Sequence, residues 1–155
     1  MQEIERKFLV DVSLLPSLEN WPATKKFEIS QGYLVNESDK SIRVRTKNDK
    51  AFLTFKIGKN ALSRTEIEHE IPAEEAKVLL TEWNAKTLQK TRFLIEHGCH
   101  TWELDRFEGK LNGLWLAEIE LQTEDEQFEL PAWVGDEVTQ NPEYLNANLI
   151  NRIEF

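Results

Sequence analysis

Apolar and polar residues alternate with period two through most of the first 122 residues. Between residues 3 and 10, for example, the ionised residues Glu3, Glu5 and Lys7 share one face of the segment, while Ile4 and Phe8 lie on the other. This period is typical of a strand with two different faces. The pattern recurs and predicts strands over residues 2–10, 26–35, 40–48, 50–59, 62–71, 87–97, 100–108 and 113–122.

Turn and helix signals separate these segments. Asparagine and glycine, which tolerate the backbone angles of tight turns, occur at Asn48-Asp49, Gly58-Lys59-Asn60, His97-Gly98 and Asn112-Gly113. Pro72 precedes a run from Ala73 to Leu80 that predicts a helix, because proline is well tolerated at a helix start. Shorter helical segments are expected over Val12–Leu18, Pro131–Val138 and Glu143–Asn151.

The ionised faces differ in sign from strand to strand. Arg43 and Arg45 form a basic pair, as do Lys90 and Arg92, whereas 118 and 120 are both glutamates. A single charged strand face is usually only a solvated surface, but segregated signs on several strands favour a shared polar interior. We therefore predict an α+β fold in which eight antiparallel strands close into a barrel with a charged lumen, with a few helices outside.

A barrel lined with long ionic side chains needs a partner for its charges. Charges removed from water are costly unless they are well paired. We therefore expect the lumen to be wet and to hold an anion together with metal ions. The prediction depends on register, because a slip of one residue would turn every charged stripe outward.

The composition limits the alternatives. With 155 residues the chain is expected to form a single domain over residues 1–155, and a net charge of −9 argues against nonspecific nucleic-acid binding. The single cysteine, Cys99, excludes an internal disulfide. No apolar run approaches the ~20 residues of a membrane span, and the charged first residues do not form a signal peptide, so a cytoplasmic protein without a membrane partner is expected.

The ordered set of charged motifs resembles the CYTH domain, or triphosphate tunnel metalloenzyme, family over nearly the whole chain. The motifs that carry this resemblance are Glu3-x-Glu5-x-Lys7, Gln31-Gly32-Tyr33-Leu34, Arg43-x-Arg45, Thr54-x-Lys56, Arg64-x-Glu66-x-Glu68, Lys90-x-Arg92, Asp105 with Gly109, and Glu118-x-Glu120. The resemblance implies an eight-stranded tunnel that binds a linear triphosphate, and it implies Mg²⁺ or Mn²⁺, with two ions expected. The chain is most similar to small bacterial members, several of which act as inorganic triphosphatases.

Roles follow from this resemblance and from ligand chemistry. Cationic side chains suit phosphate oxygens, and carboxylates suit hard divalent metals. The expected phosphate-binding residues are Lys7, Arg43, Arg45, Lys56, Arg64, Lys90 and Arg92. The expected metal ligands are Glu3, Glu5, Glu66, Glu68, Asp105, Glu118 and Glu120, with Lys7, Glu5 and Glu120 taking part most directly in the reaction. Glu103 shares their strand face but lies nearer a strand end, and it is not among the expected ligands.

The expected reaction is metal-dependent hydrolysis of tripolyphosphate to pyrophosphate and phosphate. Phosphoryl transfer asks mainly for positioning and charge stabilisation, so no protein nucleophile is required. ATP cyclisation by a class IV adenylate cyclase, thiamine or nucleoside triphosphate hydrolysis, and non-catalytic binding of polyphosphate or nucleotide remain alternatives. Homodimerisation through an outer barrel face is also expected to be compatible with this fold.

Overall fold

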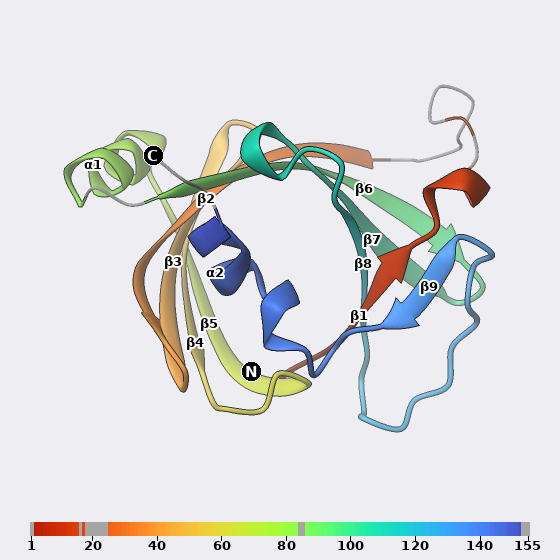
Figure 1. The fold of residues 1–155 in the computed structure, drawn as a ribbon. Helices are drawn as coiled ribbons and strands as arrows, with labels where there is room; N and C mark the ends of the chain where they lie inside the picture. Colours follow the sequence, from red (N-terminus) through yellow and green to blue (C-terminus); the bar gives the residue numbers. More distant parts are fainter. Residues whose placement is uncertain (1, 16, 18–24, 84–85, 153–155) are drawn as a thin grey trace.

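Nine antiparallel strands of the described residues form one sheet, eight of which close into a barrel (Figure 1). The computed structural model describes residues 2–15, 17, 25–83 and 86–152. The strand order is β5-β4-β3-β2-β6-β7-β8-β1-β9, and a further pairing between β5 and β1 completes the ring. The strands are β1 (Gln2–Val10), β2 (Lys25–Glu37), β3 (Lys40–Lys47), β4 (Lys50–Ile57), β5 (Ser63–Ile71), β6 (Thr87–His97), β7 (His100–Phe107), β8 (Trp115–Glu120) and β9 (Val134–Glu137).

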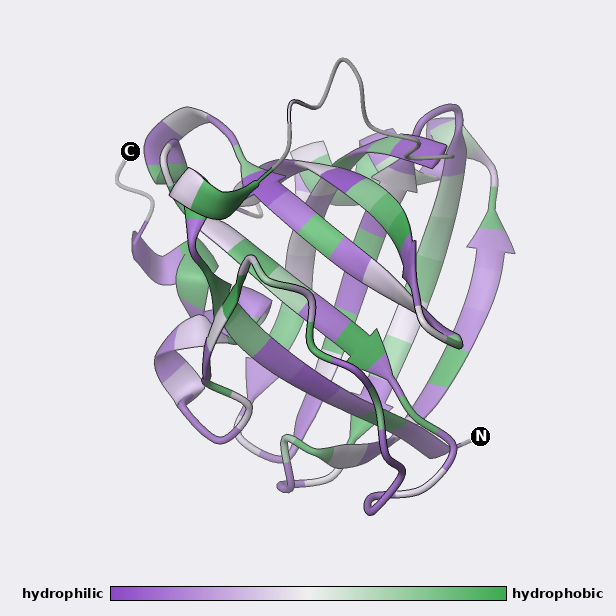
Figure 2. Ribbon diagram, turned by 90° about the vertical axis from the view of Figure 1, so that its right-hand side faces the viewer, coloured by the Kyte–Doolittle hydropathy of each residue, from purple (hydrophilic) through white to green (hydrophobic). Residues whose placement is uncertain are grey.

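The eight strands predicted from alternation are therefore confirmed, with boundaries that differ by a few residues at most. Colouring by hydropathy shows hydrophilic and hydrophobic residues succeeding one another along the strands (Figure 2). One face of each strand lines the lumen and the other faces outward, as in other closed barrels. Closure also leaves the eight barrel strands with hydrogen-bonded neighbours on both sides.

The largest apolar cluster lies outside the barrel wall rather than in its lumen. Trp102 is fully buried and packs tilted or edge-on against Phe8, Phe128 and Trp133. The cluster gathers outward-facing residues of β1, β6, β7 and β8, and the chain after β8 covers it. The helix α1 (Ala73–Glu82) packs through Ala76 against the outer side of β3 and β4.

A second apolar cluster closes part of the lumen. The buried side chains of Leu88, Phe107 and Leu116 meet Leu149 and Ile150 from the end of the described chain. Figure 1 shows α2 within the ring of strands. The C-terminal elements are η3 (Pro142–Tyr144), α2 (Asn146–Leu149) and η4 (Ile150–Arg152), and two other short helices are η1 (Val12–Leu14) and η2 (Gly109–Leu111). The charged stretch of the lumen is thus bounded by apolar packing.

One predicted helix is wrong. Residues Pro131–Val138 were expected to be helical, but Val134–Glu137 forms β9, which pairs with β1. Gly135 lies so close to β1 that an added Cβ would stand 3.3 Å from the carbonyl oxygen of Leu9. Here pairing with a neighbouring strand outweighs local sequence preference. The helical expectation at Glu143–Asn151 is confirmed. That at Val12–Leu18 is confirmed only over Val12–Leu14, since residues 15 and 17 are not helical and residues 16 and 18 lie outside the described residues.

Candidate functional site

A charged cavity of about 160 Å³ lies in the lumen. Both signs of charge contribute to it, and the charged side chains come from β1, β3, β4, β5, β6, β7 and β8, while Tyr33 of β2 also lines it. Three residues of the C-terminal segment, Leu145, Asn146 and Ala147, complete the lining. The carboxylates are Glu3, Glu5, Glu66, Glu68, Glu103, Glu118 and Glu120, and the cations are Lys7, Arg43, Arg45, Lys56, Arg64 and Arg92.

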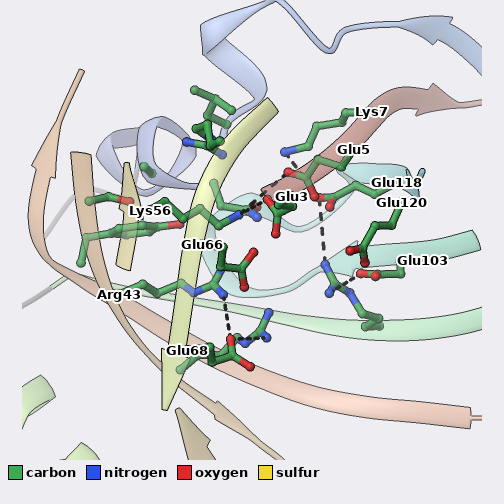
Figure 3. A pocket seen from close by; sticks show the side chains of 18 residues that line it. Glu3, Glu5, Lys7, Arg43, Lys56, Glu66, Glu68, Glu103, Glu118 and Glu120 are labelled. Carbon is green, nitrogen blue, oxygen red and sulfur yellow. Dashed lines mark hydrogen bonds and ion pairs between the residues drawn. The ribbon is translucent and has the colours of Figure 1, made fainter. Parts of the chain in front are cut away.

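The carboxylates concentrate where β1 pairs with β8. In that register Glu5 lies opposite Glu120, and Lys7 lies opposite Glu118. Figure 3 shows Glu5, Glu118 and Glu120 gathered on one side of the pocket, beside Lys7. Burial, followed by repulsion from Glu118, raises the pKa of Glu5 to about 8, although Lys56 and Lys7 act to lower it. The nearby lysines therefore do not offset the cost of ionising Glu5 in this part of the cavity.

The arginine side chains beside β3 are crowded by other cations. Burial lowers the pKa of Arg45 to about 9, and repulsion from Arg43 and Arg92 adds to the effect. Glu68 lies 3.8 Å from the Arg43 guanidinium and 3.7 Å from that of Arg45, and it accepts a hydrogen bond of 2.8 Å from the Thr54 hydroxyl. The Nε atoms of Arg43, Arg45 and Arg64 are buried and have no hydrogen-bond acceptor among the described residues. These donors favour an anion.

Two lysines contact the carboxylates on the acidic side of the cavity. Lys56 on β4 lies 2.8 Å from a carboxylate oxygen of Glu3 and 4.0 Å from one of Glu5. Lys7 is buried, lies 3.5 Å from Glu118, and donates a hydrogen bond of 2.8 Å to the main-chain carbonyl of Tyr144. Both ammonium groups therefore already lie beside oxygen atoms that a phosphate would replace or join.

The structure brings most of the sequence-predicted site residues together, but not all of them. Lys90 and Asp105 do not line the cavity, because their side chains are fully buried and form an ion pair of 2.8 Å. Arg92 does line it, and its Nε and Nη2 atoms also donate to the two oxygens of Asp105 at 2.7 and 2.9 Å. Burial would raise the pKa of Asp105, but Arg92 and Lys90 hold it below its usual value.

Sequence reasoning missed Glu103. It lies opposite Glu118 in the β7–β8 register, lines the cavity and forms a close ion pair with Arg92. Its strand-face parity is the same as that of Asp105, so the available signal was the alternation itself. The expectation that it lies near a strand end was wrong, since Glu103 lies in the middle of β7 and pairs there with Glu118.

The carboxylates of the cavity offer the oxygen ligands that hard divalent metal ions prefer. Among residues 2–15, 17, 25–83 and 86–152, no group of three His, Cys, Asp or Glu side chains is arranged to hold a metal ion by itself. Mg²⁺ keeps several waters and commonly takes only one or two carboxylates together with substrate phosphates. Glu5 and Glu118, which both line the cavity and repel each other when both are ionised, meet that smaller requirement.

A second hollow of about 490 Å³ adjoins the charged cavity and shares Ser41, Arg64, Leu145 and Ala147 with it. It lies between the β2–β3 turn, the β4–β5 connection and the C-terminal segment, and it also contains Lys40 and other polar residues. Through these shared residues the hollow borders the charged cavity. None of the helices in the described residues is long and apolar enough to span a membrane.

Comparison with known proteins identifies similar chains. The CYTH domain matches residues 1–153. An inorganic triphosphatase from Acetivibrio thermocellus is 43% identical over 150 residues, which cover 96% of this chain and 93% of that protein. An inorganic triphosphatase from Nitrosomonas europaea is 35% identical over 154 residues, which cover 96% and 97%. The crystal structure of an inorganic triphosphatase superposes with a TM-score of 0.69 at 32% identity and covers 99% of this chain and 97% of that one.

Proposed function

The chain belongs to the CYTH domain family, and from this premise we propose that it hydrolyses inorganic tripolyphosphate to pyrophosphate and phosphate with a divalent metal. Relatives that are named inorganic triphosphatases align with almost the whole chain, and this supports the same activity here. We also propose that residues 1–155 act as one domain, since the family match extends over residues 1–153.

One observation carries the proposal: the cavity contains two opposite electrostatic imbalances. The pKa of Glu5 is raised to about 8 by burial and by Glu118, so the cations already beside it do not offset the cost of ionising this carboxyl group. The pKa of Arg45 is lowered to about 9 by burial and by neighbouring guanidinium groups, so its guanidinium lacks a sufficient anion. A metal–triphosphate complex supplies both missing charges, whereas an apolar ligand supplies neither.

The basic residues would bind the phosphate oxygens. Arginine presents a planar fork of donors that matches phosphate, and lysine acts as a compact point charge. The buried Nε donors of Arg43, Arg45 and Arg64 would gain acceptors from a bound triphosphate. We assign phosphate binding to Lys7, Arg43, Arg45, Lys56, Arg64 and Arg92.

The metal would be Mg²⁺ or Mn²⁺, and we propose two ions. Glu3, Glu5, Glu118 and Glu120 would hold the first, and Glu66 and Glu68 lie where they could hold a second. When bound, such a metal neutralises phosphate charge and makes a bound water a stronger nucleophile. Glu5 would have to lose its proton before it binds the metal, because its pKa lies at about 8.

The protein's own part in the reaction is binding, orientation and charge stabilisation. The arginines and lysines fix the phosphate chain along the lumen, so that an attacking water and the leaving pyrophosphate can lie in line. The water oxygen forms a bond to a terminal phosphorus as the bridging P–O bond breaks, and the pair of electrons leaves with pyrophosphate. The proton that the attacking water loses passes to solvent. Lys7 would donate to a phosphate oxygen beside Glu118, which lies opposite it in the β1–β8 register.

Product analysis tests this proposal. The purified protein should be incubated with Mg²⁺ or Mn²⁺ and with tripolyphosphate, ATP or thiamine triphosphate in parallel. Rapid phosphate release from tripolyphosphate and much slower reaction with the organic substrates is the expected result. Cyclic AMP and pyrophosphate from ATP would instead establish a cyclase, and faster hydrolysis of thiamine triphosphate or ATP would identify an organic triphosphatase. Tight binding without turnover would indicate a non-catalytic module.

A further inference from the structure

Three charged side chains form a buried network at the wall of the charged cavity. The two oxygens of Asp105 accept hydrogen bonds from Nε and Nη2 of Arg92 at 2.7 and 2.9 Å. The Lys90 ammonium lies 2.8 Å from Oδ2 of the same carboxylate. The side chains of Lys90 and Asp105 have 0% exposure, and that of Arg92 has 10%. Only Arg92 among the three lines the cavity.

The strand register explains why the network is separate from the cavity. Arg92 on β6 lies opposite Asp105 on β7. Lys90, two residues from Arg92 along the same strand, lies opposite Phe107. Lys90 therefore faces the lumen at the depth of the apolar cluster, where its ammonium lies 5.5 Å from the centre of the Phe107 ring. Its strand face is that of the phosphate-binding residues, but its depth along the lumen differs from theirs.

The guanidinium of Arg92 has two edges, and they have different neighbours. The edge formed by Nε and Nη2 is occupied by Asp105 in a bidentate pair. Nη1 forms a close ion pair with Glu103, and Nη2 also lies 4.0 Å from Glu118. Both of these glutamates line the cavity, so the end of the guanidinium points toward the space where a ligand binds. A bidentate carboxylate on one edge fixes the plane and direction of the other.

We propose that Asp105 is a positioning residue that orients the Arg92 guanidinium toward the triphosphate, and that Lys90 balances the buried charge of Asp105 without touching the substrate. This inference rests on the proposed function. It assigns Asp105 a role other than metal binding and Lys90 a role other than phosphate binding. Both oxygens of Asp105 are already used by Arg92 and Lys90, so metal binding there would first require breaking this network.

The network's charge balance determines how it can be tested. Asp105→Asn alone would leave the Lys90 ammonium buried without a carboxylate, and breaking a buried ion pair from one side is strongly destabilising. Replacing both partners by neutral side chains of similar size is usually tolerated. The variant of choice is therefore the pair Lys90→Met with Asp105→Asn, which keeps the volume of the site and removes the anchor of Arg92.

The experiment is a double-mutant cycle on tripolyphosphate hydrolysis. The neutral pair is introduced into the wild-type chain and into Arg92→Met, and kcat, KM and thermal unfolding are measured for each. In the wild-type background we expect KM for tripolyphosphate to rise by about 10- to 100-fold, by analogy with the loss caused by removing the outer partners of metal ligands. In the Arg92→Met background the same pair should change KM little, because its effect acts through Arg92.

A matched control removes a similar pair from the outer side of the same hairpin. Arg106 and Glu108 form an exposed ion pair of 3.5 Å, so Arg106→Met with Glu108→Gln should leave KM unchanged. Calorimetric titration with tripolyphosphate in the absence of metal provides a second measurement, since Arg92 orientation should alter this affinity without any turnover. A structural defect alone would lower the unfolding temperature and the active fraction but would not raise KM selectively.

Two outcomes would overturn the inference. An equal rise in KM in both backgrounds would show that Lys90 or Asp105 contacts the substrate itself, and an unchanged KM in the wild-type background would show that Arg92 needs no anchor. Should the neutral pair not fold, Lys90→Met alone decides the question. It keeps the Arg92–Asp105 fork and should raise KM far less than Arg92→Met; an equal rise contradicts the proposal. Absence of tripolyphosphate hydrolysis by the wild-type chain would instead contradict the proposed function.

Discussion

Glu5 on β1 and Glu120 on β8 occupy directly opposed positions of two hydrogen-bonded antiparallel strands. Side chains at opposed positions have Cβ atoms only about 5 Å apart, and like charges placed there are destabilising. Both carboxylates line the same cavity, and burial with nearby glutamates raises the pKa of each. The register of β1 and β8 thus places both carboxylates on one acidic wall of the cavity. Glu118 and Glu3 repel Glu5. Glu3 and Glu103 repel Glu120, so a bound cation would relieve repulsion on this wall.

The first prediction concerns this pair. At pH 8 and above, Glu5→Gln should stabilise the metal-free protein by on the order of 1 kcal/mol, because it removes an ionised carboxylate that Glu118 repels. The same substitution should almost abolish metal-dependent hydrolysis, because an amide is a weaker metal ligand than a carboxylate. Thermal unfolding in a chelator and turnover at saturating Mg²⁺ measure the two effects. Glu120→Gln should behave similarly, and Glu82→Gln, at an exposed position of α1, should change neither. Full activity of the Glu5 variant would remove this residue from the metal site.

The second prediction concerns the cationic side of the cavity. Arg45→Met should lower the affinity for tripolyphosphate by about 10- to 100-fold, since a hydrogen bond to a charged group contributes about 1.5–3 kcal/mol. The ligand-free variant should be no less stable than the wild type, because Arg43 and Arg92 repel the buried Arg45 guanidinium. Isothermal titration calorimetry measures the affinity. Arg106→Met, on the outer face of β7, is the control, and equal affinities for the Arg45 variant and the wild type would exclude Arg45 from phosphate binding.

The third prediction separates the fold from the site. Trp102→Ala should destabilise the protein by about 3–5 kcal/mol, because Trp102 is fully buried in the apolar cluster outside the barrel wall. The KM of the remaining folded protein should stay close to that of the wild type, since Trp102 does not line the charged cavity. Urea denaturation gives the stability. Trp83→Ala serves as the control, because Trp83 is 56% exposed; a comparable loss of stability there would contradict the assignment of the core.

The faces of the strands could be predicted from sequence because the signal is local. Side chains alternate strictly along a strand, so Glu3, Glu5 and Lys7 had to share a face, and the charge on that face distinguished lumen from outer wall. The same reasoning placed Arg43 and Arg45 correctly. What alternation determines is the side of the sheet on which each residue lies.

Depth along the lumen could not be predicted, because it depends on the register of strands distant in sequence. Lys90 and Asp105 share the lumen-facing parity of Arg92 and Glu103, but only the latter two line the cavity. The boundary between the charged and apolar stretches is set by Leu149 and Ile150, which the C-terminal segment brings into the barrel. Helices were correctly expected in that segment, but the pattern of residues 143–151 contains no information about where it packs.

The last prediction is a pH dependence of stability. A glutamate has a usual pKa of 4.5, and in the folded protein the pKa of Glu5 is raised to about 8, first by burial and then by Glu118. The folded state therefore binds this proton more tightly than the unfolded state does. The resulting stabilisation is complete below pH 4.5 and is lost as the pH rises through 8, so the metal-free protein should become progressively less stable across this window. Glu120, whose pKa is also raised, contributes in the same direction.

Unfolding temperatures measured from pH 5 to 9 in a chelator should show this fall, and Glu5→Gln should flatten it. Added Mg²⁺ should reduce the fall in the wild type, because a bound cation replaces the lost proton as the partner of the carboxylate. An equally steep fall in Glu5→Gln would show that other groups control the pH dependence.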